Sequence, residues 1–192
     1  MNKEIFFTCC THFYHDNVLR FTDNNGVRIR PEFDNIDQMN EYIIEMWNEN
    51  ISPMDTVYHL GDVIFGKLEE KEKFKKDIFP KLNGRKKNLI LGNHDDGRFM
   101  ANIGWSKIRT QQTLDDLGLF LSHYPIHESS LWSFRQNKQL INVHGHIHHL
   151  EPPEGPYVNV CVERNKYKPF HLDEIYQLAK DKNFNNEMVM TL

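Results

Sequence analysis

The sequence predicts an α/β fold, and three observations support this. The length of 192 residues suits one compact domain, residues 1–192. Hydrophobic residues make up 39% of the chain and charged residues 26%, enough apolar material for a buried core. Short apolar runs alternate with amphipathic segments, and no repeat or long linker interrupts them. Strands and helices are therefore expected to alternate along a single domain.

Six apolar runs are predicted to be strands, because they are short, rich in β-branched or aromatic residues and bounded by polar or turn residues. They are Glu4–Cys9, Thr56–Leu60, Asn88–Leu91, Gly118–Leu121, Leu140–Val143 and Tyr157–Val162.

Three segments are predicted to be helices. Apolar residues recur at three- and four-residue spacing over Asn35–Asn50, after a cap expected at Asp37, which is typical of a core-facing crossover helix. The charged segment Lys67–Leu82 has a narrower apolar stripe and is predicted to be a surface helix that ends near Pro80. Asp173–Lys180 is expected to form a short last helix, followed by a polar tail that frays.

Charge and composition exclude several function classes. The net charge of -4 disfavours stable nucleic-acid binding. No stretch of about 18 apolar residues suggests a membrane span, and the first residues do not resemble a signal peptide. The chain has three cysteines, an odd number whose spacing does not suggest a framework of disulfide bonds. A cytoplasmic protein without membrane partners is expected.

Ionisable residues gather where predicted strands end. Single motifs of this kind are most often turns or packed histidines. In α/β sheets, however, ligands bind at the carboxyl ends of strands, so five such segments are expected to meet at one site. The histidines in these segments indicate metal binding. The segments are Cys10-Thr11-His12, Gly61-Asp62, Gly92-Asn93-His94-Asp95, Ser122-His123 and His144-Gly145-His146-Ile147-His148.

This ordered set resembles the calcineurin-like metallophosphoesterases, whose pattern is Asp-x-His, Gly-Asp, Gly-Asn-His-Asp/Glu, His and Gly-His-x-His. Four blocks match, and the first differs because Cys10 stands where the family has aspartate. Local runs such as Tyr58-His59-Leu60-Gly61-Asp62 are similar to a small, single-domain bacterial and phage branch of that family. The resemblance implies a four-layer α/β/β/α sandwich of two mixed sheets flanked by helices.

The resemblance also implies a binuclear metal centre that hydrolyses a phosphate ester. A hydroxide held between the ions would attack phosphorus, since two ions about 3.5–4 Å apart activate water and neutralise the phosphoryl oxygens. Zn, Fe or Mn suits the donor set. The implied ligands are Cys10, His12, Asp62 and His148 for the first ion, and Asp62, Asn93, His123 and His146 for the second.

His94 and Asp95 are the catalytic residues that the resemblance implies. His94 would protonate the leaving oxygen, and Asp95 would orient its ring. A third metal ligand or a turn residue is the competing interpretation of His94. The expected substrate is small, either a phosphodiester or a nucleotide-like ester.

Cys10 leaves three interpretations open. A ligating thiolate would favour Zn²⁺ or iron over Mg²⁺. A non-ligating thiol would leave the first site weakened or vacant, giving either a one-metal enzyme or a catalytically weakened phosphate- or metal-binding module. A vicinal disulfide between Cys9 and Cys10 would switch the site off. Strand alternation predicts that Cys9 points away from Cys10 and packs in the core.

Overall fold

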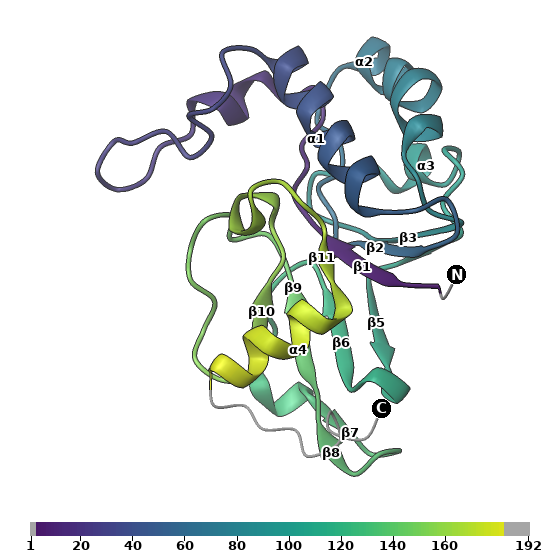
Figure 1. Cartoon of the computed structure of the whole chain (residues 1–192), viewed down its shortest axis with the longest axis vertical. Coiled ribbons are helices and arrows are strands. Elements are labelled where there is room, and N and C mark those ends of the chain that lie inside the picture. Colours follow the sequence, from purple (N-terminus) through teal and green to yellow (C-terminus); the bar gives the residue numbers. More distant parts are fainter. Residues whose placement is uncertain (1–2, 183–192) are drawn as a thin grey trace.

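Two mixed β-sheets form the centre of the computed structural model, which describes residues 3–182 (Figure 1). In the first sheet the strand order is β11-β1-β2-β3-β4; β1 to β4 are parallel and β11 is antiparallel to β1. Its strands are β1 (Ile5–Thr8), β2 (Thr56–His59), β3 (Lys86–Ile90), β4 (Lys107–Arg109) and β11 (Phe170–His171).

In the second sheet the order is β10-β9-β6-β5, with β5 antiparallel to its neighbour and the others parallel. Its strands are β5 (Gln111–Leu114), β6 (Leu119–Ser122), β9 (Ile141–His144) and β10 (Tyr157–Asn159). A separate hairpin pairs β7 (Trp132–Ser133) with β8 (Lys138–Gln139).

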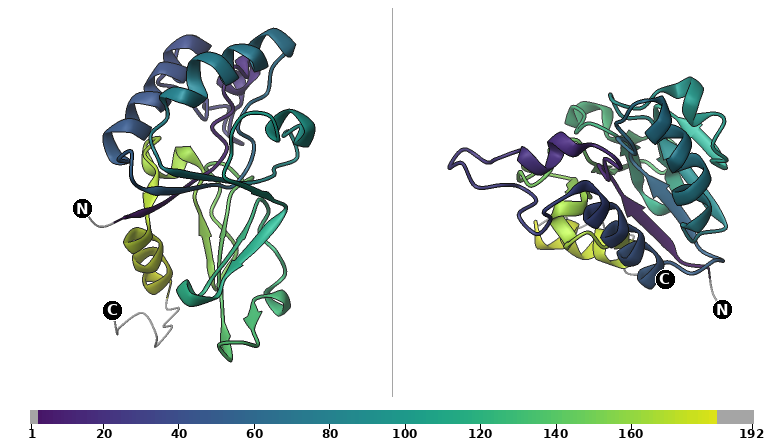
Figure 2. Two further views of the ribbon diagram at one scale, coloured as in Figure 1. Left: turned by 90° about the vertical axis from the view of Figure 1, so that its right-hand side faces the viewer. Right: turned by 90° about the horizontal axis from the view of Figure 1, so that it is seen from above.

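The helices lie mainly outside the first sheet (Figures 1 and 2). They are α1 (Ile36–Asn50), α2 (Leu68–Lys73), α3 (Gly97–Met100) and α4 (Leu172–Asp181). A π-helical turn and a 3₁₀ turn continue α2 as far as Lys81. Further 3₁₀ turns span Asp16–Arg20, Asp115–Leu117, Glu128–Ser130 and Val162–Asn165.

All six predicted strands and all three predicted helices are present, with bounds that differ by a few residues. The predicted cap of α1 is wrong: the side chain of Asn35, not Asp37, accepts the backbone N–H of Gln38 over 3.0 Å. Asp37 lies inside the first turn, where its charge favours the helix dipole. The polar tail expected to fray begins near Lys182 and otherwise lies outside the described residues.

Alternation along β1 divides the core into two parts. Phe6 packs with apolar residues of α1 and of the helical segment after α2, which cover one face of the first sheet. Phe7 points the other way, into the space between the sheets, where it meets Leu121 of β6 and Ile175 of α4. The two sheets therefore share an apolar interface, with α4 packed against it.

The inner face of the second sheet packs against the first sheet and α4, whereas its outer face is covered by an irregular segment. Phe120, Leu140 and Tyr157 pack there with Leu131 and Ile126, from the segment that carries the β7–β8 hairpin. The α/β class with two mixed sheets is confirmed. The four-layer arrangement is not confirmed: the segment that packs on this face contributes a 3₁₀ turn and a hairpin.

Among residues 3–182, no helix is both long enough and apolar enough to cross a lipid bilayer.

Candidate metal centre

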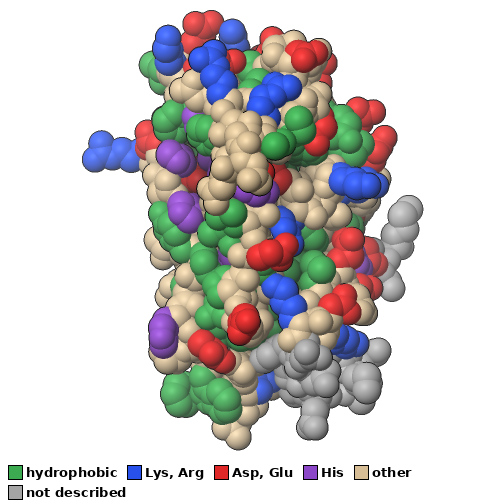
Figure 3. Space-filling view, turned by 90° about the vertical axis from the view of Figure 1, so that its left-hand side faces the viewer, with side chains coloured by type: hydrophobic (Ala, Val, Ile, Leu, Met, Phe, Trp, Pro, Cys, Tyr) green, Lys and Arg blue, Asp and Glu red, His purple; other side chains and the backbone are tan. Residues whose placement is uncertain are grey.

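The seven predicted metal ligands converge beyond the carboxyl ends of β1, β2, β3, β6 and β9. Cys10 connects two groups whose ligand atoms lie within 4.8 Å of one another: one contains His12 and His148, the other Asp62 and His123. Asn93 and His146 complete the set, since each lies beside His123. Several histidine side chains lie in the upper half of one face of the molecule, and another lies lower on the same face (Figure 3). The convergence that the sequence predicts is present.

Most of these side chains are carried by residues in the left-handed region of backbone conformation. Non-glycine residues rarely adopt it, and such strain is typical of functional sites. The chain thus turns sharply after β1, β2 and β9 and directs these side chains toward the centre. The φ angles are 57° at Cys10, 51° at His12, 56° at Asp62, 68° at His146 and 50° at His148.

His12 has the feature that most directly indicates a cation-binding site. Its side chain is 1% exposed, and neither ring nitrogen has a hydrogen-bond partner in the described part of the chain. Burial holds its pKa well below the ordinary value, so the imidazole is neutral. Its ring stacks on that of His148 with centroids 5.2 Å apart. A buried polar group without a partner is costly, and a bound cation would satisfy it.

His123 is held with one nitrogen directed into the site. Its Nδ1 donates to the carbonyl oxygen of Leu60 over 2.7 Å, so Nε2 is the nitrogen that a metal ion would take. Nε2 is 3.3 Å from Oδ2 of Asp62 and 3.1 Å from Oδ1 of Asn93. This is the arrangement of a histidine that a carbonyl orients toward a metal.

Asp62 lies between the two groups. Its Oδ2 is 3.8 Å from Nε2 of His12 and 3.3 Å from Nε2 of His123. Its Oδ1 accepts the backbone N–H of His94 over 3.0 Å. Burial acts to raise the pKa of Asp62, but the contact with His123 and the N–H of His94 outweigh it, and the pKa is lowered. An anionic carboxylate thus faces both halves of the centre.

The donor set fits two divalent transition-metal ions. Imidazoles, a thiol, a carboxylate and an amide oxygen are the ligands of zinc, iron and manganese sites. In the described part of the chain neither ring nitrogen of His12 has a hydrogen-bond partner, and Nε2 of His123 is directed at Asp62 and Asn93. The residues present therefore suit the binuclear centre that the sequence predicts.

Cys10 belongs to a cluster of three buried thiols. Its Sγ lies 3.4 Å from Sγ of Cys9 and 3.5 Å from Sγ of Cys161, and the backbone N–H of His146 lies 3.3 Å from it. All three cysteines are free. Burial raises the pKa of the Cys10 thiol well above its usual value. A metal ion would have to displace this proton for Cys10 to ligate.

The predicted orientation of Cys9 is wrong, although Cys9 does pack in the core as expected. Alternation applies only while the strand continues, and β1 ends at Thr8. The left-handed turn at Cys10 brings neighbouring thiols together instead of separating them.

His94 and Asp95 have separate surroundings. The His94 side chain is exposed at the mouth of the centre, and its ring packs against Phe65 with centroids 4.9 Å apart and lies 5.8 Å from the ring of His12. The carboxylate of Asp95 accepts backbone N–H groups of Asp62, Val63 and Gly92 over 2.8–3.0 Å.

The role predicted for Asp95 is therefore corrected. In the described structure no hydrogen bond joins its carboxylate to the ring of His94. A carboxylate can satisfy several backbone amides at once, and Asp95 uses this capacity to tie the loop after β2 to the loop after β3. Asp95 positions the ligand loops.

Glu163 and Arg30 support the centre, and the sequence did not indicate them. Glu163 Oε1 accepts from Nδ1 of His148 over 2.8 Å, which leaves Nε2 of His148 directed at Cys10 and His12. Arg30 donates to the same oxygen over 2.7 Å and to the carbonyl oxygen of Cys10 over 2.6 Å. Both side chains are almost fully buried. The only sequence feature that could have drawn attention to Glu163 is its place directly after the apolar residues 160–162.

Glycines allow the ligand loops to approach one another closely. A Cβ at Gly92 would lie 2.2 Å from Oδ1 of Asp62, and one at Gly145 would lie 1.9 Å from Sγ of Cys9. Any larger residue at these positions would displace a predicted ligand or its neighbour.

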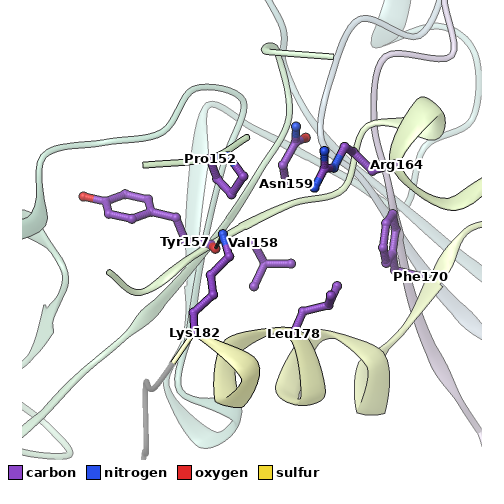
Figure 4. A pocket seen from close by; sticks show the side chains of 8 residues that line it. All are labelled: Pro152, Tyr157, Val158, Asn159, Arg164, Phe170, Leu178 and Lys182. Atoms are coloured by element: carbon purple, nitrogen blue, oxygen red, sulfur yellow. Dashed lines mark hydrogen bonds between the residues drawn. The ribbon is translucent and has the colours of Figure 1, made fainter. Parts of the chain in front are cut away.

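A cavity of about 60 Å³ lies between β10 and α4, and none of the predicted ligands lines it (Figure 4). Leu178 of α4 and Val158 of β10 line it, and Nζ of Lys182 donates to the carbonyl oxygen of Tyr157 over 3.3 Å. The cavity is too small for a substrate and separate from the centre.

Fold and site together define an α/β protein with a histidine-, cysteine- and aspartate-containing centre at the carboxyl ends of its strands. Over 184 residues the chain is 31% identical to the uncharacterized protein MJ1445 of Methanocaldococcus jannaschii, which spans 93% of this chain and 92% of that protein. The chain therefore belongs to the same family as MJ1445.

Two further proteins are similar. The gene 66 protein of Mycobacterium phage D29 is 28% identical over 172 residues, 76% of this chain and 79% of that protein. The crystal structure of AQ665 from Aquifex aeolicus, a protein of unknown function, superposes with a TM-score of 0.65 and 28% identity over 92% of this chain and 100% of that one. No protein-family model matches the chain.

Proposed function

We propose that this protein is a metal-dependent phosphoesterase of the calcineurin-like type. The observation that carries the proposal is the buried, unpartnered imidazole of His12 within a convergent set of seven candidate ligands. The order of the motifs along the chain supports the same class.

The candidate ligands fall into two sets, one for each of two metal ions. Cys10, His12 and His148 would hold the first, and Asn93, His123 and His146 the second, with Asp62 facing both. When bound, two such ions supply activation of water and neutralisation of phosphoryl charge. Glu163 and the carbonyl oxygen of Leu60 fix the rings of His148 and His123 in advance.

His94 is positioned to protonate the leaving oxygen. It is exposed at the mouth of the centre, its backbone is held by Asp62, and its ring is supported by Phe65. A histidine beside the leaving oxygen can serve as a general acid.

The substrate we propose is a small phosphodiester or nucleotide-like ester. The net charge of -4 argues against a polyanion as the bound partner. The free thiols of the three cysteines support a reducing, cytoplasmic location.

Hydrolysis of bis(p-nitrophenyl) phosphate by the purified chain tests the proposal, with Mn²⁺, Zn²⁺ or Fe²⁺ added in turn. We expect metal-dependent turnover that His94→Ala lowers by about 10²–10⁴-fold and that Asp62→Asn abolishes. Ion binding without turnover under every metal would instead favour the alternative, a phosphate- or metal-binding module weakened by Cys10.

A further inference from the structure

A groove leads away from the candidate metal centre. Asn93 and His123 form its inner end, and Leu91, Gln111, Tyr124 and Ile126 contribute to its walls. Its volume of about 340 Å³ falls within the range of small-molecule sites, about 300–1,000 Å³. A group attached to a phosphate at the centre would extend into this groove.

The groove is lined without formal charge. No lysine, arginine, aspartate or glutamate contributes to it. Charged substituents would lose hydration there without gaining a counter-ion, so the groove suits an uncharged group.

One wall of the groove is held rigidly. Ser122 Oγ donates to the carbonyl oxygen of Tyr124 over 2.6 Å, and Asn142 donates to Ser122 Oγ over 2.8 Å. Asn142 Oδ1 also accepts the N–H of Ile126 over 3.0 Å, while the hydroxyl of Tyr157 donates to the carbonyl oxygen of Ile126 over 2.7 Å. The backbone around Tyr124 is thus fixed on both sides, which reduces the entropy lost on binding.

The side chain of Tyr124 is anchored at the metal centre yet remains open to solvent. Its ring lies 4.3 Å from the ring of His146 and 4.9 Å from that of His123, and it is 45% exposed. Gln111 faces solvent as well. Within residues 3–182, no hydrogen bond engages the Tyr124 hydroxyl or the Gln111 amide.

We infer that this groove binds the organic group of the ester as an uncharged planar ring of the nucleobase type, stacked on Tyr124, with the amide of Gln111 available to its polar edge. Aromatic rings stack on bases of any identity, and an amide can both donate and accept. The inference rests on the proposed function, because it takes the phosphate to lie at the metal centre.

Affinity for two monoesters with the same phosphate group tests the inference. Thymidine 5′-monophosphate carries a planar uncharged base and methyl phosphate does not. We expect the Mn²⁺-loaded protein, studied by titration calorimetry, to bind thymidine 5′-monophosphate at least about tenfold more tightly, as stacking on an aromatic residue predicts.

Substitutions in the groove test whether its residues cause the difference in affinity between the two monoesters. Tyr124→Leu should remove about tenfold of the preference, Tyr124→Phe should retain it, and Gln111→Ala should reduce it by a smaller factor. Phe134 is an exposed aromatic residue outside the groove, 92% accessible, and Phe134→Leu should leave both affinities unchanged. Metal content is measured for each variant, because Tyr124 touches two candidate ligands.

Equal affinities for the two monoesters would overturn the inference, as would a preference that survives Tyr124→Leu at full metal content. Hydrolysis of bis(p-nitrophenyl) phosphate reports separately on the proposed function. A protein that does not hydrolyse the ester but shows the Tyr124-dependent preference would support the groove inference and contradict the proposed phosphoesterase activity.

Discussion

Glu163 holds His148 through a 2.8 Å hydrogen bond from Nδ1 to Oε1, and the same oxygen accepts from the buried guanidinium of Arg30. The carboxylate therefore fixes the orientation of a candidate metal ligand and balances a buried positive charge. Burial acts to lower the pKa of His148, but Glu163 outweighs it and raises the pKa.

Glu163→Gln should weaken metal binding by about 10–100-fold, the usual cost of losing a partner that orients a metal-bound histidine. Competition with a chromogenic chelator measures this. Glu151→Gln is the matched control, because Glu151 pairs with Arg164 at the exposed surface and exposed pairs contribute only about 0–1 kcal/mol. Equal metal affinity in the two variants would show that Glu163 does not act through His148.

Metal removal should lower thermal stability. An ion would bind one of the two unpartnered nitrogens of His12 in the folded chain. Binding should then stabilise the folded chain by about 2.7 kcal/mol at a hundredfold excess of metal over its Kd. Scanning calorimetry with added Mn²⁺ or excess chelator measures the shift. His12→Ala should largely lose the response, and a Tm that is independent of metal in the unsubstituted protein would exclude a site at His12.

Cys10 should control which metal binds. Cys10→Asp replaces a soft sulfur with a hard oxygen and should shift preference from Zn²⁺ or iron toward Mn²⁺ and Mg²⁺. Elemental analysis after growth with mixed metals measures the shift. Cys161→Ser is the control, since it changes a neighbouring buried thiol. Full metal stoichiometry and an unchanged rate in Cys10→Ala would rule out ligation by Cys10.

Substitutions of Asp95 and His94 should differ in their effect on the free energy of unfolding. Asp95→Asn replaces one of the two acceptor oxygens that serve three backbone amides with a donor NH₂ and should cost about 1–3 kcal/mol in urea unfolding. His94→Ala alters an exposed side chain and should change the free energy of unfolding by less than about 0.5 kcal/mol. A large stability loss in His94→Ala would assign His94 to the fold instead of the reaction.

Gly145 should tolerate no side chain while Cys9 is present. A Cβ there would overlap Sγ of Cys9, so Gly145→Ala should destabilise the protein by about 1–3 kcal/mol. The double variant Cys9→Gly with Gly145→Ala removes the overlap and should be more stable than the sum of the single effects implies. Additive effects in this cycle would mean that the two residues do not touch.

The sequence predicted the strands and the convergence of ligands because both follow from local pattern. Apolar runs mark buried strands such as β2, and polar residues after parallel strands must meet at one edge. The edge strands β4 and β5 were not predicted, since their side chains alternate only weakly between exposed and half-buried positions.

The remaining parts of the site depend on contacts between distant segments. Glu163 lies 15 residues from His148 and 133 from Arg30, and no local spacing relates them. The role of Asp95 depends on backbone amides more than 30 residues earlier. The meeting of Cys9 with Cys10 follows from one left-handed residue, which composition and periodicity do not reveal.

The metal-to-protein ratio of the purified, metal-loaded chain tests the central claim most directly. Elemental analysis should find about two ions per chain, as a binuclear centre requires, and Asp62→Asn should lower the ratio because Asp62 faces both halves of the centre. A ratio well below one that Asp62→Asn does not change would contradict the account.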